Sequence, residues 1–431
     1  MTMKKLLTAI VALLAAHSAL AGVKIEHWVS PAGARVFFVE SRVLPILDVQ
    51  VDFAAGSMFD PPGKSGTAGL TRSVLGLGAG KLDETAIAEQ MADIGATLGG
   101  GADTDRASVA MRTLATAEKR DAALAVLRTV VQAPRFEAAI FEREKARTIA
   151  GLKEAMTRPD SIAGKAFWAA MYPDHPYGRS ATPESVAVLT RDDLTAHHAT
   201  YYTAANASIT LVGDINRGEA EKIAEAIAAG LPKGAPATLP PAPRVAPGKA
   251  VQLAHPASQA HIHIGMPAIE RGNADFFPLI VGNYTLGGGG FVSRLMKEVR
   301  DKRGYAYSVS SYFNPLRQAG PFQIGLQTKR AQAKDAIALS RDVLDGFLKD
   351  GPSMEELAAA KANLTGSFPL RLDSNRKILD NVAVIGFYGL PLDYLDHYQQ
   401  KVQAVTVDDV KRAFSRHVRP ADLMTVTVAA D

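Results

Sequence analysis

The sequence predicts an α+β protein of two homologous tandem domains, each an antiparallel sheet covered by helices, joined by a proline-rich linker in a clam-like shell. The chain has 431 residues, more than one hydrophobic core usually organises. Residues 231–250 hold six prolines, a density that no helix interior or central strand tolerates. The order of strand-like and helix-like segments before this stretch recurs after it, which indicates a duplicated unit.

The first unit is predicted from alternating valine, phenylalanine and leucine residues, followed by helical periodicity. Its elements are strands over residues 36–40 and 47–53, helices from about residue 65 and over 84–94, a strand over 107–113 and a helix over 117–131. Gly95 supplies the stop of the second helix.

The second unit repeats this order. Its predicted elements are a strand over 260–266, helices over 275–286 and 291–303, strands over 305–313 and 322–328, and a helix over 332–349. Gly304 ends the helix over 291–303, and Asp121 and Asp335 occupy matching places in the matching helices. We therefore expect domains over residues 22–230 and 251–431, with the linker over 231–250 between them.

The first 21 residues are expected to be a secretory signal peptide. Lys4 and Lys5 precede an apolar stretch over residues 6–16, and small residues lead to Ala21, after which cleavage is expected. A mitochondrial presequence is the alternative, but such segments are rich in arginine and amphipathic. The apolar stretch is shorter than the roughly 20 residues of a membrane span, and no later segment is long enough either. The predicted location is the periplasm.

Composition excludes several classes of function. The 48 basic and 44 acidic residues give a formal charge of +4 and are interspersed, so nucleic acid is not an expected partner. The chain has no cysteine. Disulfides, cysteine nucleophiles and thiolate metal ligands are therefore all excluded.

A set of motifs in a fixed order covers nearly the whole mature chain. The first half carries Ala55-Gly56-Ser57, Gly66-Thr67-Ala68, Phe141-Glu142-Arg143-Glu144, His175-Pro176-Tyr177-Gly178 and Ile209-Thr210-Leu211-Val212-Gly213-Asp214. The second half carries Ser293-Arg294-Leu295, Arg300, Arg303-Gly304 and Ala306-Tyr307-Ser308. In this order and spacing the chain resembles the pitrilysin (insulinase, mitochondrial processing peptidase) family of zinc metallopeptidases.

The resemblance implies a zinc site that this chain lacks. Active members carry an inverted H-x-x-E-H motif on the first helix and a distal glutamate ligand. The matching positions here are Gly69, Arg72 and Ser73, and the distal one is Gly151, seven residues after Glu144. Glycine has no donor, serine is a poor zinc ligand, and the charge of arginine opposes a divalent cation. The N-terminal domain is thus expected to be peptidase-like with a degenerate zinc motif, and Glu144 to support the fold alone.

Two pairs of histidines are the other candidate metal ligands in the sequence. His261 and His263 alternate on one strand face, but no carboxylate accompanies them, so a structural role is expected. His197 and His198 point in different directions on a helix. The sequence leaves open whether Arg72 is a surface replacement or an ion-pair member. We expect no metal or other cofactor on this chain.

Arg300 and Tyr307 are the predicted functional residues of the C-terminal peptidase-like domain. They follow one another from a helix end into a strand, which can bring both side chains to one place. In the family an arginine and a tyrosine at this spacing approach the scissile peptide, so the resemblance implies catalytic and substrate-binding roles for both. A solvated helix-end arginine and a core tyrosine are the plain alternative. Gly287 to Gly290 lack the lysine of a phosphate loop and are expected to permit close backbone approach.

These observations favour a zinc-free subunit of a heteromeric metallopeptidase. A homologous partner would carry the zinc, and an unfolded or short polypeptide would bind as a strand on a sheet edge. The alternative is a non-catalytic peptide-binding or structural scaffold subunit. A self-sufficient peptidase with an unrecognised metal is a third hypothesis, the least supported.

Overall fold

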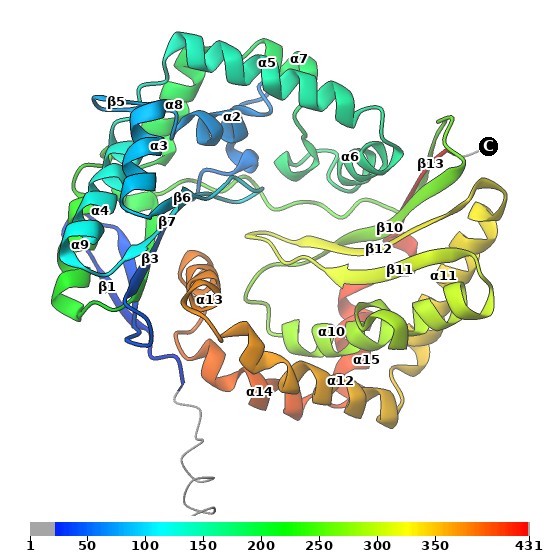
Figure 1. Cartoon of the computed structure of the whole chain (residues 1–431). Coiled ribbons are helices and arrows are strands. Elements are labelled where there is room, and N and C mark those ends of the chain that lie inside the picture. The colour runs from blue at the N-terminus through cyan, green and yellow to red at the C-terminus, as the bar shows by residue number, and fades with distance from the viewer. Residues whose placement is uncertain (1–21, 430–431) are drawn as a thin grey trace, which may run out of the picture.

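The computed structural model describes residues 22–429, so the expected signal peptide lies outside the described part of the chain. Two halves, each a sheet with helices, face one another across the molecule (Figure 1). The predicted α+β fold with a clam-like arrangement is confirmed. In residues 22–429 no helix is long and apolar enough to cross a membrane.

The N-terminal half is built on a six-stranded sheet in the order β1-β2-β8-β3-β7-β6. All neighbours are antiparallel except β2 and β8, which run parallel. The strands are β1 (Glu26–Val29), β2 (Arg35–Glu40), β3 (Ile46–Phe53), β6 (Thr97–Gly99), β7 (Ala107–Leu114) and β8 (Ala207–Gly213). A short hairpin of β4 (Gly78–Ala79) and β5 (Leu82–Asp83) lies apart from this sheet.

The C-terminal half is built on a five-stranded sheet in the order β11-β12-β10-β13-β9. Its strands are β9 (Ala250–Leu253), β10 (Gln259–Ile269), β11 (Ala306–Phe313), β12 (Gly320–Lys329) and β13 (Met424–Val428). Here too one pair, β9 and β13, is parallel. The two sheets have the same topology, because the order β2-β8-β3-β7-β6 corresponds strand by strand to β9-β13-β10-β12-β11. The parallel pair occupies the same place in both. The antiparallel sheets that we predicted are therefore mixed, because β2 and β9 each run parallel to the last strand of their sheet, β8 and β13.

Helices cover the outer face of each sheet. In the N-terminal half they are α2 (Thr67–Val74), α3 (Glu84–Asp93), α4 (Ala117–Gln132), α5 (Ala138–Ala155), α7 (Pro183–Ala187), α8 (Arg191–Tyr201) and α9 (Arg217–Ala228). In the C-terminal half they are α10 (Phe276–Asn283), α11 (Ala333–Asp350), α12 (Met354–Gly366), α14 (Tyr394–Ala404) and α15 (Val407–His417). Each half has its own apolar core between sheet and helices.

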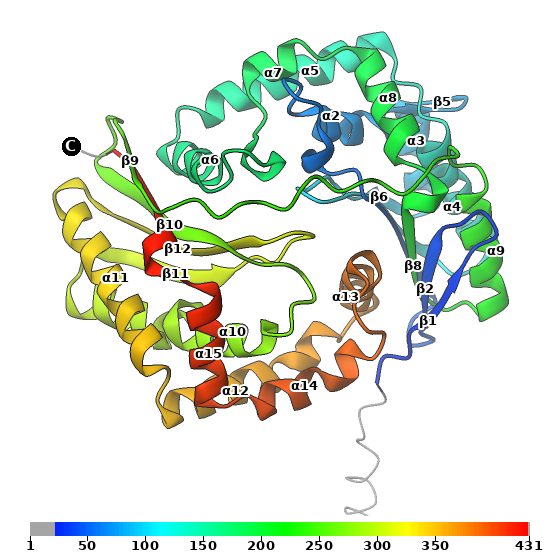
Figure 2. The ribbon, with the colours of Figure 1, turned by 180° about the vertical axis from the view of Figure 1, so that it is seen from behind.

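The two halves exchange one helix each. Helix α6 (Pro159–Met171) of the N-terminal half packs on β10 and β13, and α13 (Asn375–Tyr388) of the C-terminal half packs on β2, β3 and β8 (Figure 2). Phe37 and Val39 of β2 point toward Leu379 and Val382 of α13, whereas the alternate β2 residues point into the N-terminal core. Both faces of each sheet are thus covered, one of them by the other half.

A buried carboxylate also joins the halves. Asp105, 1% exposed, accepts hydrogen bonds from the Tyr177 hydroxyl at 2.7 Å and the Tyr388 hydroxyl at 2.8 Å. The backbone N–H of Arg317 donates to the same carboxylate at 2.8 Å. Tyr177 belongs to the N-terminal half, and the other two donors belong to the C-terminal half. Burial raises the pKa of Tyr177 and of Tyr388, so both hydroxyls stay protonated donors.

The segment between the halves, residues 232–249, contains no helix or strand. Hydrogen bonds hold it along its length. Gln318 Nε2 donates to the Pro240 carbonyl at 2.5 Å, the Ala237 N–H donates to Asn206 Oδ1 at 3.1 Å, and the Gly248 N–H donates to the Ala421 carbonyl at 2.8 Å.

One predicted helix begins later than expected. Instead of a helix from residue 291, Gly290–Val292 forms a 3-10 turn, and Ser293 is extended with ψ 155°. The Ser293 hydroxyl donates to the Gly290 carbonyl at 2.7 Å, which holds this turn, and the helix starts after it. Over Met296–Lys302, here called η6, the helix has π geometry. Gly304 ends it with a φ of 63°, as predicted.

Candidate functional site

The three positions that match the family's zinc ligands, Gly69, Ser73 and Gly151, lie on α2 and α5 and offer no suitable ligand. Gly69 and Gly151 are exposed, and a Cβ atom at either place would meet no heavy atom within 4 Å. Ser73 donates its hydroxyl to the Leu70 carbonyl at 2.9 Å, so its proton is used inside the helix. These residues do not fit a zinc ion.

Arg72 has a structural role that the sequence did not indicate. Its Nε donates to the Ser108 carbonyl and its Nη2 to the Gly99 carbonyl, each at 2.5 Å. Both carbonyls belong to neighbouring strands, β7 and β6, so the guanidinium fastens α2 to the sheet edge. No carboxylate pairs with Arg72 in residues 22–429, and burial lowers its pKa. Arg72 is therefore neither of the two alternatives, a surface replacement or an ion-pair member.

An ion-pair network lines the cavity beside the degenerate positions. The cavity has a volume of about 620 Å³ and is lined by Ser73, Glu84, Arg143, Glu144 and Arg147, among others. Arg143 lies 2.9 Å from both Glu84 and Glu144, and Arg147 lies 3.8 Å from Glu144. These guanidinium groups compensate the carboxylates. Among residues 22–429, no group of three or more His, Asp or Glu side chains is placed to hold a metal ion.

Three of the four paired histidines take part in packing, and the fourth, His261, is half-buried. His263 lies against the Phe167 ring at 5.3 Å and contacts Gln323 Nε2 at 2.7 Å, and burial lowers its pKa to about 4. His197 Nε2 lies 3.2 Å from the Ala55 carbonyl, and His198 Nε2 lies 2.9 Å from the Val131 carbonyl. Buried imidazoles with lowered pKa values stay neutral and serve the core.

Arg300 and Tyr307 are brought together, as the sequence predicted. The Arg300 guanidinium carbon lies 5.5 Å from the Tyr307 ring centre and 4.7 Å from that of Phe291. Among residues 22–429, Arg300 pairs with the carboxylate of Asp301 alone, at 3.4 Å. Tyr307 is 84% exposed, and its hydroxyl has no hydrogen-bond partner in the described chain. Within residues 22–429 the Tyr307 hydroxyl is unpaired, and Arg300 uses Nη1 alone in its bond to Asp301.

Phe291 is a member of this cluster that we did not predict. It is 68% exposed and its neighbour Val292 is 56% exposed. The sequence shows an aromatic residue directly after four glycines, but its exposure appears only in the structure. Close packing accounts for Gly287, because a Cβ there would lie 2.4 Å from Ser311 Oγ, and Gly290 has a φ of 61°.

The cluster lies at an open sheet edge. In the described part of the chain, strand β11, which carries Tyr307, pairs only with β12, so one of its edges has no neighbouring strand. The cluster and the degenerate zinc positions belong to different halves. No hydrogen bond, ion pair or ring contact between the two sets occurs in residues 22–429.

Comparisons with known proteins point to one family. The family profile described as "Insulinase (Peptidase family M16)" matches residues 35–183, and "Peptidase M16 inactive domain" matches residues 189–364. The "Non-peptidase homolog YmxG" of Helicobacter pylori is 26% identical over 405 residues, which cover 93% of each chain. The crystal structure of a peptidase M16 inactive domain from Pseudomonas fluorescens is 36% identical, with a TM-score of 0.91 over 95% of this chain and 98% of that one.

A more distant structure shares the fold. The periplasmic protease PqqL from Escherichia coli has a TM-score of 0.81 and 16% identity, over 94% of this chain and 45% of that chain. Together these findings show that the chain belongs to peptidase family M16. The profile described as the M16 inactive domain covers residues 189–364, and the residues at the zinc-motif positions do not fit a zinc ion.

Proposed function

We propose that this chain is the zinc-free subunit of a heteromeric metallopeptidase. A homologous partner subunit would carry the zinc, and this chain would contribute Arg300 and Tyr307 to peptide hydrolysis. The observation that carries the proposal is an asymmetry. The residues at the zinc-motif positions do not fit a zinc ion, whereas Arg300 and Tyr307 remain together. Tyr307 is 84% exposed, and the half-buried Arg300 pairs with the neighbouring Asp301.

The chemistry of the pair suits a peptide substrate. A guanidinium offers fixed, charged donors to a carbonyl oxygen, and a phenolic hydroxyl can donate to the oxyanion that develops during hydrolysis. The open edge of β11 can pair with an extended peptide through main-chain hydrogen bonds, and Phe291 adds an apolar contact beside it. The π geometry of η6, which contains Arg300, is a feature often found at functional sites.

Export to the periplasm is part of the proposal. Its support is the basic and apolar pattern of the first 21 residues, with cleavage near Ala21.

The test is to co-express the chain with a zinc-bearing relative encoded nearby and to measure cleavage of an unstructured peptide. Arg300→Ala and Tyr307→Phe are each expected to lower kcat/KM by about 10²-fold or more, because each removes a donor to the transition state. Lys302→Ala is the matched control, since Lys302 lies on the same helix and pairs only with Glu298 at 2.7 Å. A complex that stays fully active with both variants contradicts the proposal.

A peptide-binding scaffold without catalysis is the second candidate. The same open edge of β11 favours it, because Tyr307 and Tyr312, 84% and 43% exposed, could hold a peptide without a metal nearby. Micromolar peptide binding by the purified chain, combined with no cleavage by any co-purified complex, would favour the scaffold.

A further inference from the structure

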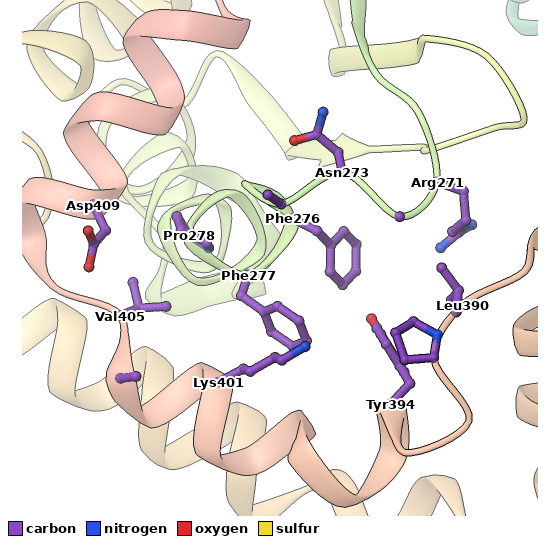
Figure 3. A pocket seen from close by; sticks show the side chains of 14 residues that line it. Arg271, Asn273, Phe276, Phe277, Pro278, Leu390, Tyr394, Lys401, Val405 and Asp409 are labelled. Atoms are coloured by element: carbon purple, nitrogen blue, oxygen red, sulfur yellow. The ribbon is translucent and has the colours of Figure 1, made fainter.

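A cavity of about 420 Å³ lies in the C-terminal half, away from the Arg300 cluster. It is formed by the loop before α10, the first turn of that helix, and helices α14 and α15 (Figure 3). Neither Arg300 nor Tyr307 lines it. Its volume is within the range of about 300–1,000 Å³ that is typical of small-molecule sites.

Aromatic rings form the wall of this cavity. Phe276 and Phe277 meet edge to face with ring centres 5.4 Å apart, and Phe277 lies 5.8 Å from Tyr394. Figure 3 shows these three side chains directed toward a common space. Such rings accommodate a flat or branched apolar group.

Two cations line the same cavity without a carboxylate partner in residues 22–429. The Lys401 ammonium lies 5.5 Å from the Phe277 ring centre, and the Arg271 guanidinium carbon lies 5.2 Å from the Tyr388 ring centre. Arg271 Nε is buried and has no hydrogen-bond partner among the described residues. A buried donor without a partner is costly, so a native structure usually has a reason for it.

The remaining polar groups of the cavity are a tyrosine hydroxyl, a carboxylate and an amide. The Tyr394 hydroxyl has no hydrogen-bond partner in the described chain, and burial raises its pKa to about 12, so it is a donor at neutral pH. The single carboxylate in the lining, Asp409, is already bonded, because it accepts from Thr406 and from Arg412. The Asn273 amide is also bonded, because it donates to Glu270 at 3.1 Å and accepts from the Asp275 N–H at 2.9 Å. The available groups are therefore two cations and one hydroxyl, and each of them can donate.

We propose that this cavity binds a carboxylate attached to an aromatic or branched aliphatic group. Arg271, Lys401 and the Tyr394 hydroxyl would hold the carboxylate, and Phe276 and Phe277 would enclose the apolar group. Such a ligand is either a free acid or the last residue of a peptide with its terminal carboxylate. This inference goes beyond the proposed function and does not depend on a zinc-bearing partner.

The test is to titrate the purified chain with three probes and to measure binding by calorimetry and by ligand-detected NMR. The probes are 3-phenylpropionate, N-acetyl-Ala-Ala-Phe and the amide of that tripeptide. Both acids are expected to bind, and the amide to bind at least about 10-fold more weakly, because it lacks the charge that the cations recognise. If the acid tripeptide binds more tightly than 3-phenylpropionate, the ligand is the C-terminus of a peptide. If the two acids bind with equal affinity, the ligand is a free acid.

Two variants locate the binding. Lys401→Gln is expected to weaken acid binding by about 10-fold, whereas Lys349→Gln, another exposed helix lysine of the same half, should leave it unchanged. Ala404→Trp, which fills the cavity without changing charge, should abolish binding. Equal affinity for acid and amide, no binding of either acid at millimolar concentration, or equal effects of the two lysine variants would overturn the inference.

Discussion

At the scale of single residues, Arg72 shows how a position that matches a metal-motif residue can become structural. Its two hydrogen bonds reach carbonyls of β6 and β7, and no acidic group shares the guanidinium. Arg72→Ala is expected to lower the free energy of unfolding by about 2–4 kcal/mol, because it removes two charge-assisted bonds and leaves carbonyls unpaired. Urea denaturation measures this. Arg147→Ala, at an 82% exposed side chain, is the control and should cost less than about 0.5 kcal/mol.

His197 makes stability depend on pH. Burial lowers its pKa from 6.5 to about 4. As pH falls below 6.5 the unfolded chain gains a proton that the folded chain takes up only near pH 4, so the free energy of unfolding decreases across this window. His197→Gln should reduce that decrease by about 1.4 kcal/mol per pH unit.

Denaturation of wild type and variant at several pH values from 7 to 4.5 checks this prediction. The variant must be compared with wild type, because Asp52 and Asp60 also affect the pH dependence of stability. Burial raises their pKa values to about 6, so they increase the free energy of unfolding as pH falls. His397→Gln, at an exposed histidine of α14, is the control. Parallel curves for His197→Gln and wild type would show that His197 does not titrate in this way.

At the scale of elements, the contact between α13 and the N-terminal sheet depends on one glycine. A Cβ at Gly386 would lie 2.5 Å from the Phe37 ring, so Gly386→Ala must move either the helix or the ring. We expect a loss of about 1–3 kcal/mol in the free energy of unfolding. Gly346→Ala is the matched control, because Gly346 is also inside a helix but faces open space. It should stabilise the chain by about 0.5–1 kcal/mol. Equal thermal shifts for the two variants would contradict this account of the contact.

The elements themselves were largely predictable, because they depend on local patterns. Alternation in the β3 and β7 segments and the stop at Gly304 gave the strands and the helix end to within a few residues. The exchange of α6 and α13 could not be predicted. It depends on which distant sheet face remains apolar, as with Phe37 and Leu379, more than 300 positions apart in the chain. The late start of the helix before Arg300 depends on a side-chain bond of Ser293.

The candidate site was predictable in part for the same reason. The proximity of Arg300 and Tyr307 follows from a helix end leading into a strand, and the structure shows it. The role of Arg72 does not follow from its neighbours in the sequence, because its acceptors at Gly99 and Ser108 become adjacent only in the folded sheet.

At the scale of the whole molecule, the exchanged helices make the two halves one unit rather than two domains on a flexible tether. Each half covers a sheet face of the other, and Asp105 binds donors from both. Because residues 233–236 are mostly exposed and lie outside every helix and strand, the chain can be cut there without breaking either core.

We therefore expect a chain with a protease site inserted at 233–236 to stay one particle after cleavage. Gel filtration of the cut protein should show both fragments eluting together at the position of the intact chain, because the apolar contacts of α6 and α13 remain buried. Asp105→Ala leaves the Tyr177 and Tyr388 hydroxyls without their acceptor. The fragments of the cut variant should therefore separate at a lower urea concentration than those of the cut wild type. Fragments that separate in buffer alone would mean that the linker, and not the helix exchange, holds the halves together.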